Sequence, residues 1–363
     1  MISRKKIKLL TIVGARPQFI KAAMFSHCLI DLKFKDQFSE VMVHTGQHYD
    51  ANMSKIFFDS LNIPKPQYIL NINNLNHGKM TGEMLIKLED IIIAEQPSAV
   101  VVFGDTNSTL AGALVASKLH IPVIHIEAGV RSFNKAMPEE LNRIMTDHVS
   151  SMLFCPTANA VTNLAKENIV TNVWCVGDIM QDLMPHVQQY EFNHDLLNQF
   201  TLTKKEYLLL TLHRAENTDD QSRLIDLLKY VEYFAQQEQL KIIFPIHPRT
   251  RKICNQYKID LDAFQLIEPL GYFDIQNLIQ HARYVFTDSG GLQKEAYYHR
   301  VPCVTLREET EWVETIDCGW NRLWQSTEYK SQQEIIEYNS AQKVADKILT
   351  IISNELIKNQ ALA

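Results

Sequence analysis

Charged and small polar residues recur at the points where predicted strands end. In parallel α/β sheets the carboxyl ends of the strands share one edge, and ligands bind at that edge. The alternative for any one residue is a helix cap or a surface charge, so the interpretation depends on their joint occurrence in both halves of the chain. The candidates are Arg16, Lys21, Asp105, Glu127, His213, His247 and the run Asp288-Ser289-Gly290-Gly291.

Two strand–helix turns have the features of anion sites. The Gly14–Pro17 turn begins a helix whose first turn proline presets, and a helix start offers N–H groups and partial positive charge. Arg16 adds a guanidinium fork, and Lys21 lies about one turn further on. In the second turn, two glycines let the backbone approach an anion, while Ser289 either caps the helix or donates to a phosphate. The alternative there is a capped helix with a tight turn. Together the turns predict a diphosphate held by both halves.

The diphosphate is not expected to belong to a dinucleotide cofactor. The chain contains neither a G-x-G-x-x-G fingerprint nor the GK[ST] of a P-loop. Glycine is also scarce, at 12 residues, so the glycines at strand–helix junctions carry more information than usual. We therefore expect a bound nucleotide without NAD, and no cofactor.

Three carboxylates, Asp105, Glu127 and Glu139, fall near these turns, where a diphosphate would avoid negative charge. They must instead contact sugar hydroxyls or transfer protons. Pro138-Glu139-Glu140 is typical of a helix start, and the two glutamates lie about 100° apart on the helix, so only one faces the site. Arg143 lies one turn beyond Glu139 and pairs with it or with the ligand. The alternative is that these acids only favour the helix macrodipole.

Three histidines could suggest a metal site, but their spacing does not support one. His44 ends a predicted strand, and His48 and His77 are expected in loops. No H-E-x-x-H motif or cysteine partner accompanies them, so structural or ligand-contact roles are favoured and no metal is expected.

An apolar group follows the predicted turn at residues 269–271. Tyr272, Phe273 and Ile275 either border a nucleobase or belong to the core. Their spacing does not decide between the two.

The elements that position these residues alternate between strand and helix. Short apolar, β-branched runs at 8–13, 41–45, 100–103 and 123–126 precede amphipathic stretches that include 52–61 and 108–119, and the pattern restarts at 207–211, 241–244, 265–267, 284–287 and 302–306. This alternation predicts an α/β protein of two doubly wound Rossmann-like domains facing a cleft. The expected boundaries are 1–182 and 183–340, with a C-terminal helix at 341–363 that packs back on the first domain.

Composition narrows the class of protein. A length of 363 residues fits two domains at roughly 100–200 residues each. The net charge of −6 argues against non-specific electrostatic binding to nucleic acid or anionic lipid. No apolar run reaches membrane-spanning length. Six scattered cysteines without a C-x-x-C pair, and an N-terminus without a cleavage site, are typical of a cytoplasmic protein with reduced thiols.

Six ordered motifs along nearly the whole chain resemble the non-hydrolysing UDP-N-acetylglucosamine 2-epimerase family. They are Thr11–Lys21 (TIVGARPQFIK), Gly104–Thr106 (GDT), His125–Arg131 (HIEAGVR), Pro138–Arg143 (PEELNR), His213–Asn217 (HRAEN) and Asp288–Glu295 (DSGGLQKE). The resemblance implies a GT-B-like fold, a homodimer, and inversion of the sugar at C2 without NAD or metal, by elimination of UDP to a glycal and its re-addition.

The resemblance also implies roles for individual residues. Asp105, Glu127, Glu139 and His213 match catalytic positions of the family, and Glu295 matches a ribose contact. The remaining nucleotide-sugar contacts match Arg16, Lys21, Ser289, Gly290 and Gly291. Physically, cations stabilise the departing diphosphate, one carboxylate removes the C2 proton and a donor on the other face returns it. Which carboxylate serves which face stays open.

Some segments depart from that pattern. Three runs are more similar to the branch acting on UDP-2,3-diacetamido-glucuronic acid: 45–50, 52–54 and 308–312. The sugar of that substrate carries a C6 carboxylate, which would need an extra cation. The candidates for it are His44, His77 and Lys79. Gln47 and His247 resemble positions where a second UDP-sugar activates some bacterial members, and His44 is a further candidate contact.

Alternatives with a related fold are a GT-B glycosyltransferase, a hydrolysing epimerase and a catalytically silent nucleotide-sugar sensor.

Overall fold

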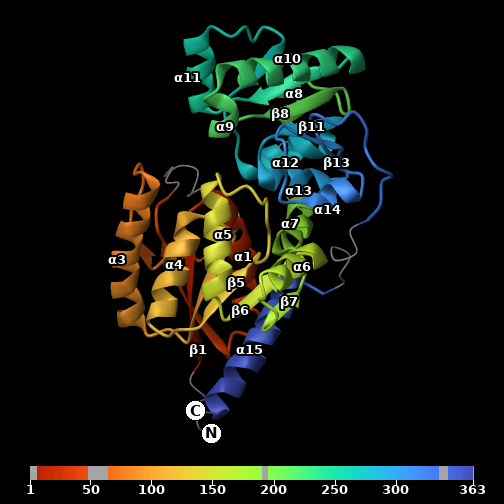
Figure 1. Cartoon of the computed structure of the whole chain (residues 1–363). Coiled ribbons are helices and arrows are strands. Elements are labelled where there is room, and N and C mark those ends of the chain that lie inside the picture. Colours follow the sequence, from red (N-terminus) through yellow and green to blue (C-terminus); the bar gives the residue numbers. More distant parts are fainter. Residues whose placement is uncertain (1–5, 48–63, 190–194, 335–341, 363) are drawn as a thin grey trace. The chain divides into compact units, whose positions relative to one another are not determined.

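The computed structural model describes residues 6–47, 64–189, 195–334 and 342–362 (Figure 1). The helix predicted at 52–61 and His48 lie outside the described residues. By its internal contacts the chain divides into two compact units, Met1–Leu183 with Ile336–Ala363, and Met184–Ile335. No helix in the described part of the chain is long and apolar enough to span a bilayer.

The N-terminal unit is built on a seven-stranded parallel sheet with the order β3-β2-β1-β4-β5-β6-β7. β4 (AVVVF) is buried along its whole length, as expected for a central parallel strand covered on both faces. This order, with the chain starting at the centre and winding outward in both directions, confirms the doubly wound prediction. The strands are β1 (Ile7–Val13), β2 (Phe38–His44), β3 (Tyr68–Ile69), β4 (Ala99–Phe103), β5 (Val123–Ile126), β6 (Met152–Cys155) and β7 (Val173–Cys175).

Helices connect these strands and bury their apolar faces against the sheet. Side chains of β1 and β4 form one core cluster with α3 and α4. The α3 helix begins at His77, so the expectation that His77 lies in a loop was wrong. Its cap residue, Asn76, makes no side-chain cap hydrogen bond, although Met80, Met84 and Leu88 follow a helical period. The helical segments are α1 (Arg16–Ile30), α3 (His77–Glu95), α4 (Asn107–Lys118), α5 (Pro138–Val149), α6 (Ala158–Lys166) and the 3₁₀ turn η1 (Ile179–Leu183).

The C-terminal unit repeats the plan with six parallel strands in the order β10-β9-β8-β11-β12-β13. Along β8, Leu208 and Leu210 join the cluster that includes residues of α10, whereas Tyr207 and Leu209 join residues of α12, so helices cover both faces. The strands are β8 (Tyr207–Thr211), β9 (Lys241–Pro245), β10 (Phe264–Ile267), β11 (Tyr284–Thr287), β12 (Cys303–Thr305) and β13 (Asn321–Leu323). The helices are α7 (Met184–Gln189), α8 (Asp195–Gln199), α9 (Ala215–Thr218), α10 (Gln221–Glu238), α11 (Pro248–Tyr257), α12 (Tyr272–His281), α13 (Gly290–Tyr298) and α14 (Val313–Asp317).

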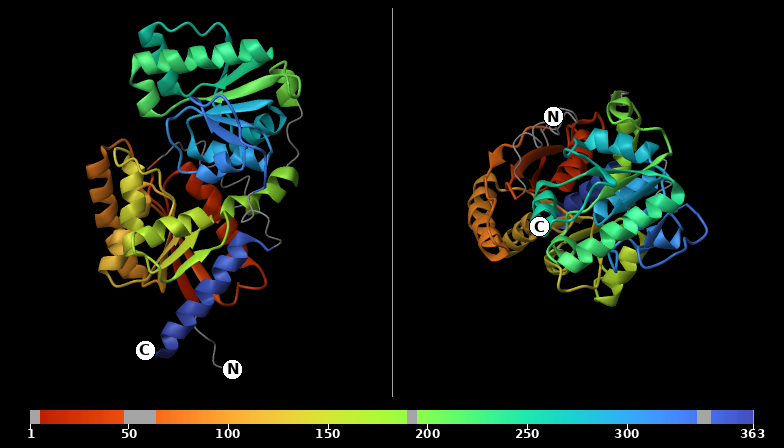
Figure 2. Two further views of the ribbon diagram at one scale, coloured as in Figure 1. Left: turned by 45° about the vertical axis from the view of Figure 1, so that its right-hand side comes forward. Right: turned by 90° about the horizontal axis from the view of Figure 1, so that it is seen from above.

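The last helix, α15 (Val344–Leu362), belongs to the N-terminal unit and packs against α1 (Figures 1 and 2). Its first turn is capped by a residue far away in sequence: the buried Asp182 carboxylate accepts the backbone N–H groups of Val344 at 2.9 Å and Ala345 at 2.8 Å. On α1, the Cys28 thiol donates to the Asp346 carboxylate at 2.8 Å. One carboxylate thus satisfies two of the N–H groups that a helix start leaves unpaired.

We predict that Asp182→Ala lowers the free energy of unfolding by about 1–2 kcal/mol, because the start of α15 loses its cap and two N–H groups lose their acceptor. Urea unfolding followed by circular dichroism measures the change. The exposed Asp36→Ala variant is the control and should stay within about 0.5 kcal/mol of the unsubstituted protein. Equal stability of the two variants would contradict the capping role.

Candidate functional site

Asp105 and Glu127 follow the carboxyl ends of β4 and β5, and Lys21 of α1 pairs with Glu127 there. The Lys21 ammonium lies 2.6 Å from the Glu127 carboxylate, and both side chains are about nine-tenths buried. Gly104 provides the space for this pair: a Cβ there would lie 3.3 Å from Glu127 Oε1 and 3.5 Å from Lys21 Nζ, and its φ of +61° also favours glycine. Lys21, expected to face phosphate, is therefore engaged by a carboxylate in the structure.

Glu127 occupies an unusual backbone conformation. Its φ of +75° lies in the left-handed region, which is strained for a residue other than glycine. The conformation turns the chain sharply out of β5, and the N–H groups of Glu127 and Ala128 both donate to the Phe154 carbonyl at 3.0 Å. The turn thus holds the Glu127 carboxylate at the sheet edge beside Gly104.

Arg143 on α5 ties Asp105 into the same cluster. Its guanidinium forms an ion pair with the Asp105 carboxylate and a second one with Glu140 at 2.8 Å. Burial is the largest influence on Asp105 and raises its pKa; Glu139 and Glu127 reinforce the rise, while Arg143 and Lys21 oppose it. A carboxyl with a raised pKa, facing two other carboxylates, is the kind of group that exchanges protons.

The two glutamates at the start of α5 have different surroundings. Glu140 is buried and accepts the N–H groups of Ser132 at 3.0 Å and Phe133 at 2.8 Å. Burial opposes its ionisation, but these N–H groups and Arg143 outweigh burial and keep the pKa of Glu140 low. Glu139 is half-buried, and its charge is felt at Asp105. Glu140 therefore has a structural role, and Glu139 is the one of the pair that faces the cluster.

The β1–α1 turn differs from the expected phosphate cradle. The Gln18 side-chain oxygen accepts the N–H groups of Gly14 at 2.8 Å and Ala15 at 3.1 Å. The amides of the turn itself are therefore engaged by a side chain of α1. Arg16 begins α1 as predicted, but its side chain lies outside the described part of the structure. An anion at this helix start would thus depend on side chains more than on the turn.

Gln47 lies at the same sheet edge, next to α4. Its side-chain oxygen accepts from the N–H of Ser108 at 3.0 Å and from the Ser108 hydroxyl at 2.8 Å. The hydroxyls of Thr45 and Ser108 fill the space beside Gly14, where a Cβ would lie 2.2 Å and 2.1 Å from their oxygens. Gln47 therefore belongs to the polar layer that closes over the β1–α1 turn.

His44 is buried and packs against Phe19, with ring centroids 4.7 Å apart. Burial lowers the pKa of His44 to about 4, so the ring is neutral at neutral pH and does not supply a cation for a sugar carboxylate. His77 contacts the Asn107 side chain at the starts of α3 and α4. Lys79 is exposed on the first turn of α3.

In the C-terminal unit, His213, His247 and Asp288 meet at the ends of β8, β9 and β11. The His213 Nδ1 lies 3.2 Å from the buried Asp288 carboxylate, and the rings of His213 and His247 are 6.3 Å apart. Asp288 also accepts the N–H groups of His213 and Arg214. One carboxylate thus fixes both the backbone and the ring of His213, whose side chain remains 45% exposed.

The start of α13 carries the predicted serine and glycines. Ser289 stands at the cap position but makes no side-chain cap hydrogen bond, so its hydroxyl is not used to close the helix. The Glu311 carboxylate lies so close to Gly290 that a Cβ there would be 2.3 Å from its oxygen, while Gly291 has only ordinary contacts. Glu311 pairs with the buried Arg307 at 2.7 Å. An acidic side chain therefore borders this helix start.

Glu295, one turn along α13, is held by the neighbouring helix. Its carboxylate accepts from the Gln276 amide at 2.7 Å, and the Gln276 oxygen lies 2.8 Å from His299 Nε2. Burial lowers the pKa of His299 to about 4, so this ring is neutral and donates. The chain of hydrogen bonds fixes the orientation of the Glu295 carboxylate.

The apolar group of α12 is buried. Tyr272, Phe273 and Ile275 are each less than a tenth exposed, and Ile275 belongs to the core cluster on that face of the sheet. Of the two readings left open by the sequence, burial of these side chains favours the core.

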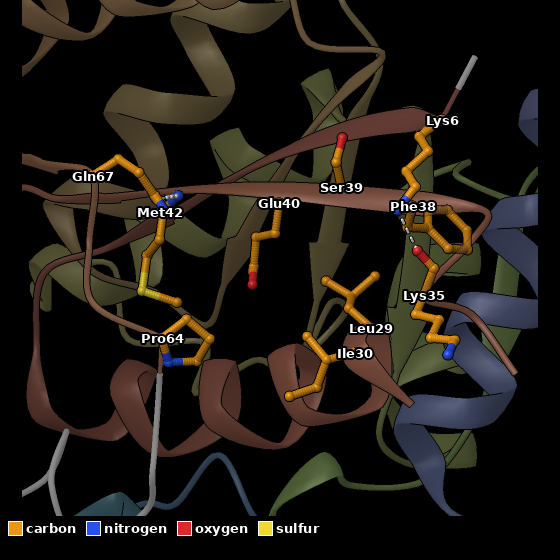
Figure 3. Close-up of a pocket in the computed structure, with 10 residues that line it drawn as sticks. All are labelled: Lys6, Leu29, Ile30, Lys35, Phe38, Ser39, Glu40, Met42, Pro64 and Gln67. Atoms are coloured by element: carbon orange, nitrogen blue, oxygen red, sulfur yellow. Dashed lines mark hydrogen bonds between the residues drawn. The ribbon is translucent and has the colours of Figure 1, made fainter. Parts of the chain in front are cut away.

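A separate hollow of about 350 Å³ lies in the N-terminal unit (Figure 3). Leu29, Ile30 and Met42 line it, and the Glu40 carboxyl accepts from the Thr11 hydroxyl at 2.6 Å. None of the predicted site residues lines this hollow, so it is distinct from the cluster at the strand ends. Among the described residues, no three histidine, cysteine or carboxylate side chains come together as a metal site.

Sequence reasoning missed the buried side chains that hold the turns in place. Gln18, His125 and Asn142 were noted only as parts of motifs, and Asp147 was not noted. One signal was available: Gln18 stands at the third position of α1, where a glutamine commonly reaches back to the N-terminal amides. The others follow from no local pattern, because their partners lie far away in sequence.

Comparison with known proteins places the chain in a family. The family model for UDP-N-acetylglucosamine 2-epimerase matches residues 31–353. A UDP-2,3-diacetamido-2,3-dideoxy-D-glucuronate 2-epimerase of Pseudomonas aeruginosa is 50% identical over 87% of this chain and 88% of its own length, and a UDP-N-acetylglucosamine 2-epimerase of Methanocaldococcus jannaschii is 44% identical over 87% and 88%.

Solved structures agree with this. A crystal structure of the Methanocaldococcus jannaschii UDP-GlcNAc 2-epimerase in complex with UDP-GlcNAc and UDP has a TM-score of 0.86 and 40% identity, covering 96% of this chain and 99% of that one. The expected GT-B-like architecture of two Rossmann-like domains is confirmed by this match and by the two parallel sheets. The chain belongs to the UDP-N-acetylglucosamine 2-epimerase family.

Proposed function

We propose that this protein is a non-hydrolysing UDP-sugar 2-epimerase that interconverts UDP-N-acetylglucosamine and UDP-N-acetylmannosamine, or acts on a close UDP-2-acetamido sugar. UDP leaves C1 and a proton leaves C2, which gives a glycal; a proton then adds to the opposite face of C2 as UDP adds back to C1. Family membership and the charged cluster at the ends of β4 and β5 support this proposal. The product would serve as a precursor of surface polysaccharide.

The cluster of three carboxylates and two cations is the observation that carries the proposal. Glu127 and Glu139 help to raise the pKa of Asp105, and Lys21 and Arg143 balance part of this negative charge. A glycosyltransferase needs a diphosphate clamp but has no need of several carboxylates around one sugar ring. Inversion at C2 does need them, because a proton is removed on one face and returned on the other.

The C-terminal unit supplies groups suited to the nucleotide. We propose that Ser289, Gly290 and Gly291 at the start of α13 face the phosphates, as the N–H groups of a helix start favour anions. Glu295 is positioned to accept ribose hydroxyls, and His213 contacts the reacting sugar. We propose that Arg16, at the start of α1, is a further contact of the UDP-sugar. No metal or redox cofactor enters this scheme.

A second substrate, UDP-2,3-diacetamido-glucuronate, is favoured by the Pseudomonas aeruginosa relative at 50% identity. The sugar of that substrate carries an additional carboxylate. Because His44 is neutral, the partner for this carboxylate would be Lys79 or His77. Gln47 and His247 remain our candidates for a second UDP-sugar site.

We also propose that the protein acts as a homodimer in the cytoplasm. Exposed isoleucines stand two turns apart on α3, at Ile86 and Ile93, and Leu141 and Met145 are exposed on α5. Apolar surface of this kind fits a second copy of the chain. All six cysteines are free, which fits a reducing compartment.

Incubation in deuterated water tests the reaction. We expect deuterium at C2 of both UDP-N-acetylglucosamine and UDP-N-acetylmannosamine with UDP still attached, because the C2 proton exchanges with solvent through an enzyme carboxyl. Mass spectrometry and NMR measure this, and UDP-2,3-diacetamido-glucuronate is assayed in parallel. Net release of UDP, or transfer of the sugar to an added acceptor, would contradict the proposal.

We predict that Asp105→Asn, Glu127→Gln and His213→Ala each lower kcat by about 10²–10⁴-fold, because each removes a group that transfers a proton or contacts the reacting ring. The Glu95→Gln variant is a matched control, since Glu95 forms a lysine pair with Lys8 in the same unit at 3.2 Å but lies at the end of α3. It should retain full turnover. Unchanged turnover in any of the three would remove that residue from the site.

We further predict that Asp105→Asn does not destabilise the fold at neutral pH. Since the folded-state pKa of Asp105 is raised, its stabilising contribution is present below about pH 4 and is lost as pH rises through the folded pKa. The variant removes the unfavourable buried charge, so its thermal midpoint at pH 7.5 should equal or exceed that of the unsubstituted protein. The difference should shrink as the pH approaches 4. A clearly lower midpoint at pH 7.5 would contradict this reading of Asp105.

A further inference from the structure

Three consecutive backbone carbonyls lead from the end of β4 to Asp105, and each accepts a hydrogen bond from a side chain of a different element. The Gln18 amide of α1 donates to the Phe103 carbonyl at 2.8 Å. The His125 ring of β5 bonds the Gly104 carbonyl through Nε2 at 2.8 Å. The Asn142 amide of α5 donates to the Asp105 carbonyl at 2.9 Å. We call these three side chains the carbonyl clamp.

Each member of the carbonyl clamp is fixed in turn by further bonds. Gln18 also bonds the Thr109 hydroxyl at 2.8 Å, in addition to the amides of the β1–α1 turn. His125 is fully buried, and its Nδ1 lies 2.6 Å from the Asp147 carboxylate. Asn142 also donates to the Asn107 oxygen at 3.2 Å. The donors therefore have little freedom to follow the turn if it moves.

This arrangement exceeds what an ordinary turn requires. Carbonyls beyond the end of a strand are commonly satisfied by water, which leaves the loop free to move. Here buried side chains from α1, β5 and α5 restrain three successive peptide units just before and at Asp105. His125 also stands two residues before Glu127, so one ring joins the turns that carry both carboxylates.

We propose that Gln18, His125 and Asn142 are positioning residues of the epimerase, which fix the β4–α4 turn and thereby aim the Asp105 carboxylate. The proposal rests on the proposed function, because it assigns to Asp105 a role in the reaction. An error of about 1 Å in the position of a reacting group can cost about 10²-fold in rate. The carbonyl clamp prevents such displacement without touching the substrate.

Asn142→Ala is the first test, because alanine is compatible with the interior of α5 and the substitution removes the amide that bonds the Asp105 carbonyl and the Asn107 oxygen. We expect kcat per folded molecule to fall about 10- to 100-fold, while KM for the UDP-sugar stays within about 2-fold. If that variant does not fold, Asn142→Ser replaces it. A kcat within 2-fold of the unsubstituted enzyme, or a loss confined to KM, would overturn the proposal.

Asp182→Ala is the matched control. Asp182 is also a buried side chain of this unit that bonds backbone groups, the N–H groups of Val344 at 2.9 Å and Ala345 at 2.8 Å, and it lies outside both turns that carry Asp105 and Glu127. We expect a drop in thermal midpoint and nearly full kcat. An equal loss of kcat in both variants would show that general destabilisation explains the effect, and would overturn the positioning role.

A double-substitution cycle separates this proposal from the proposed function. If Asn142 acts through Asp105, adding Asn142→Ala to the Asp105→Asn enzyme should lower the residual deuterium incorporation by less than about 2-fold. The same proportional loss in both backgrounds would overturn the positioning role. Full turnover of the Asp105→Asn enzyme would instead refute the site assignment on which the proposal rests.

Discussion

Burial of like charges is the constraint on which the N-terminal half of the site depends. Asp105 and Glu127 leave adjacent strands, and Glu139 on α5 is close enough to raise the pKa of Asp105. Lys21 and Arg143 compensate part of this charge, but Arg143 is shared with Glu140. The cluster therefore keeps a net negative charge. It suits proton exchange with a sugar, and it is poorly suited to hold a diphosphate.

The C-terminal unit places a different set of groups at the ends of its strands. Its strand ends carry the helix start at Ser289–Gly291 and the ring of His213. The Asp288 carboxylate is fully buried, accepts the N–H groups of His213 and Arg214 and lies beside the His213 ring, so it orders the loop, while the Glu311 carboxylate borders the start of α13. Each unit thus gathers chemically reactive side chains at its own strand ends: a cluster of acids in the N-terminal unit, and a histidine and a glycine-bearing helix start in the C-terminal unit.

The sequence predicted most strands and the residues at their ends, because apolar runs and turn residues are local signals. It did not predict α3, whose start lacks a side-chain cap, or the occupation of the β1–α1 amides by Gln18. It left Glu139 and Glu140 unresolved, since helical spacing shows that two side chains diverge but not which way they face. The buried contacts of Glu140 with Ser132 and Phe133 supplied the answer.

The missed residues share one property: their partners are distant in the chain, so their roles arise only in the folded protein. Glu127 shows why such residues are needed. A non-glycine residue at φ +75° relaxes unless its surroundings hold it. Here Asp147 binds His125, Arg131 and the Gly129 amide, and so restrains β5 on one side of Glu127 and the loop on the other. A carboxylate that is held at a sheet edge by a strained backbone needs fixed surroundings, and long-range polar contacts provide them.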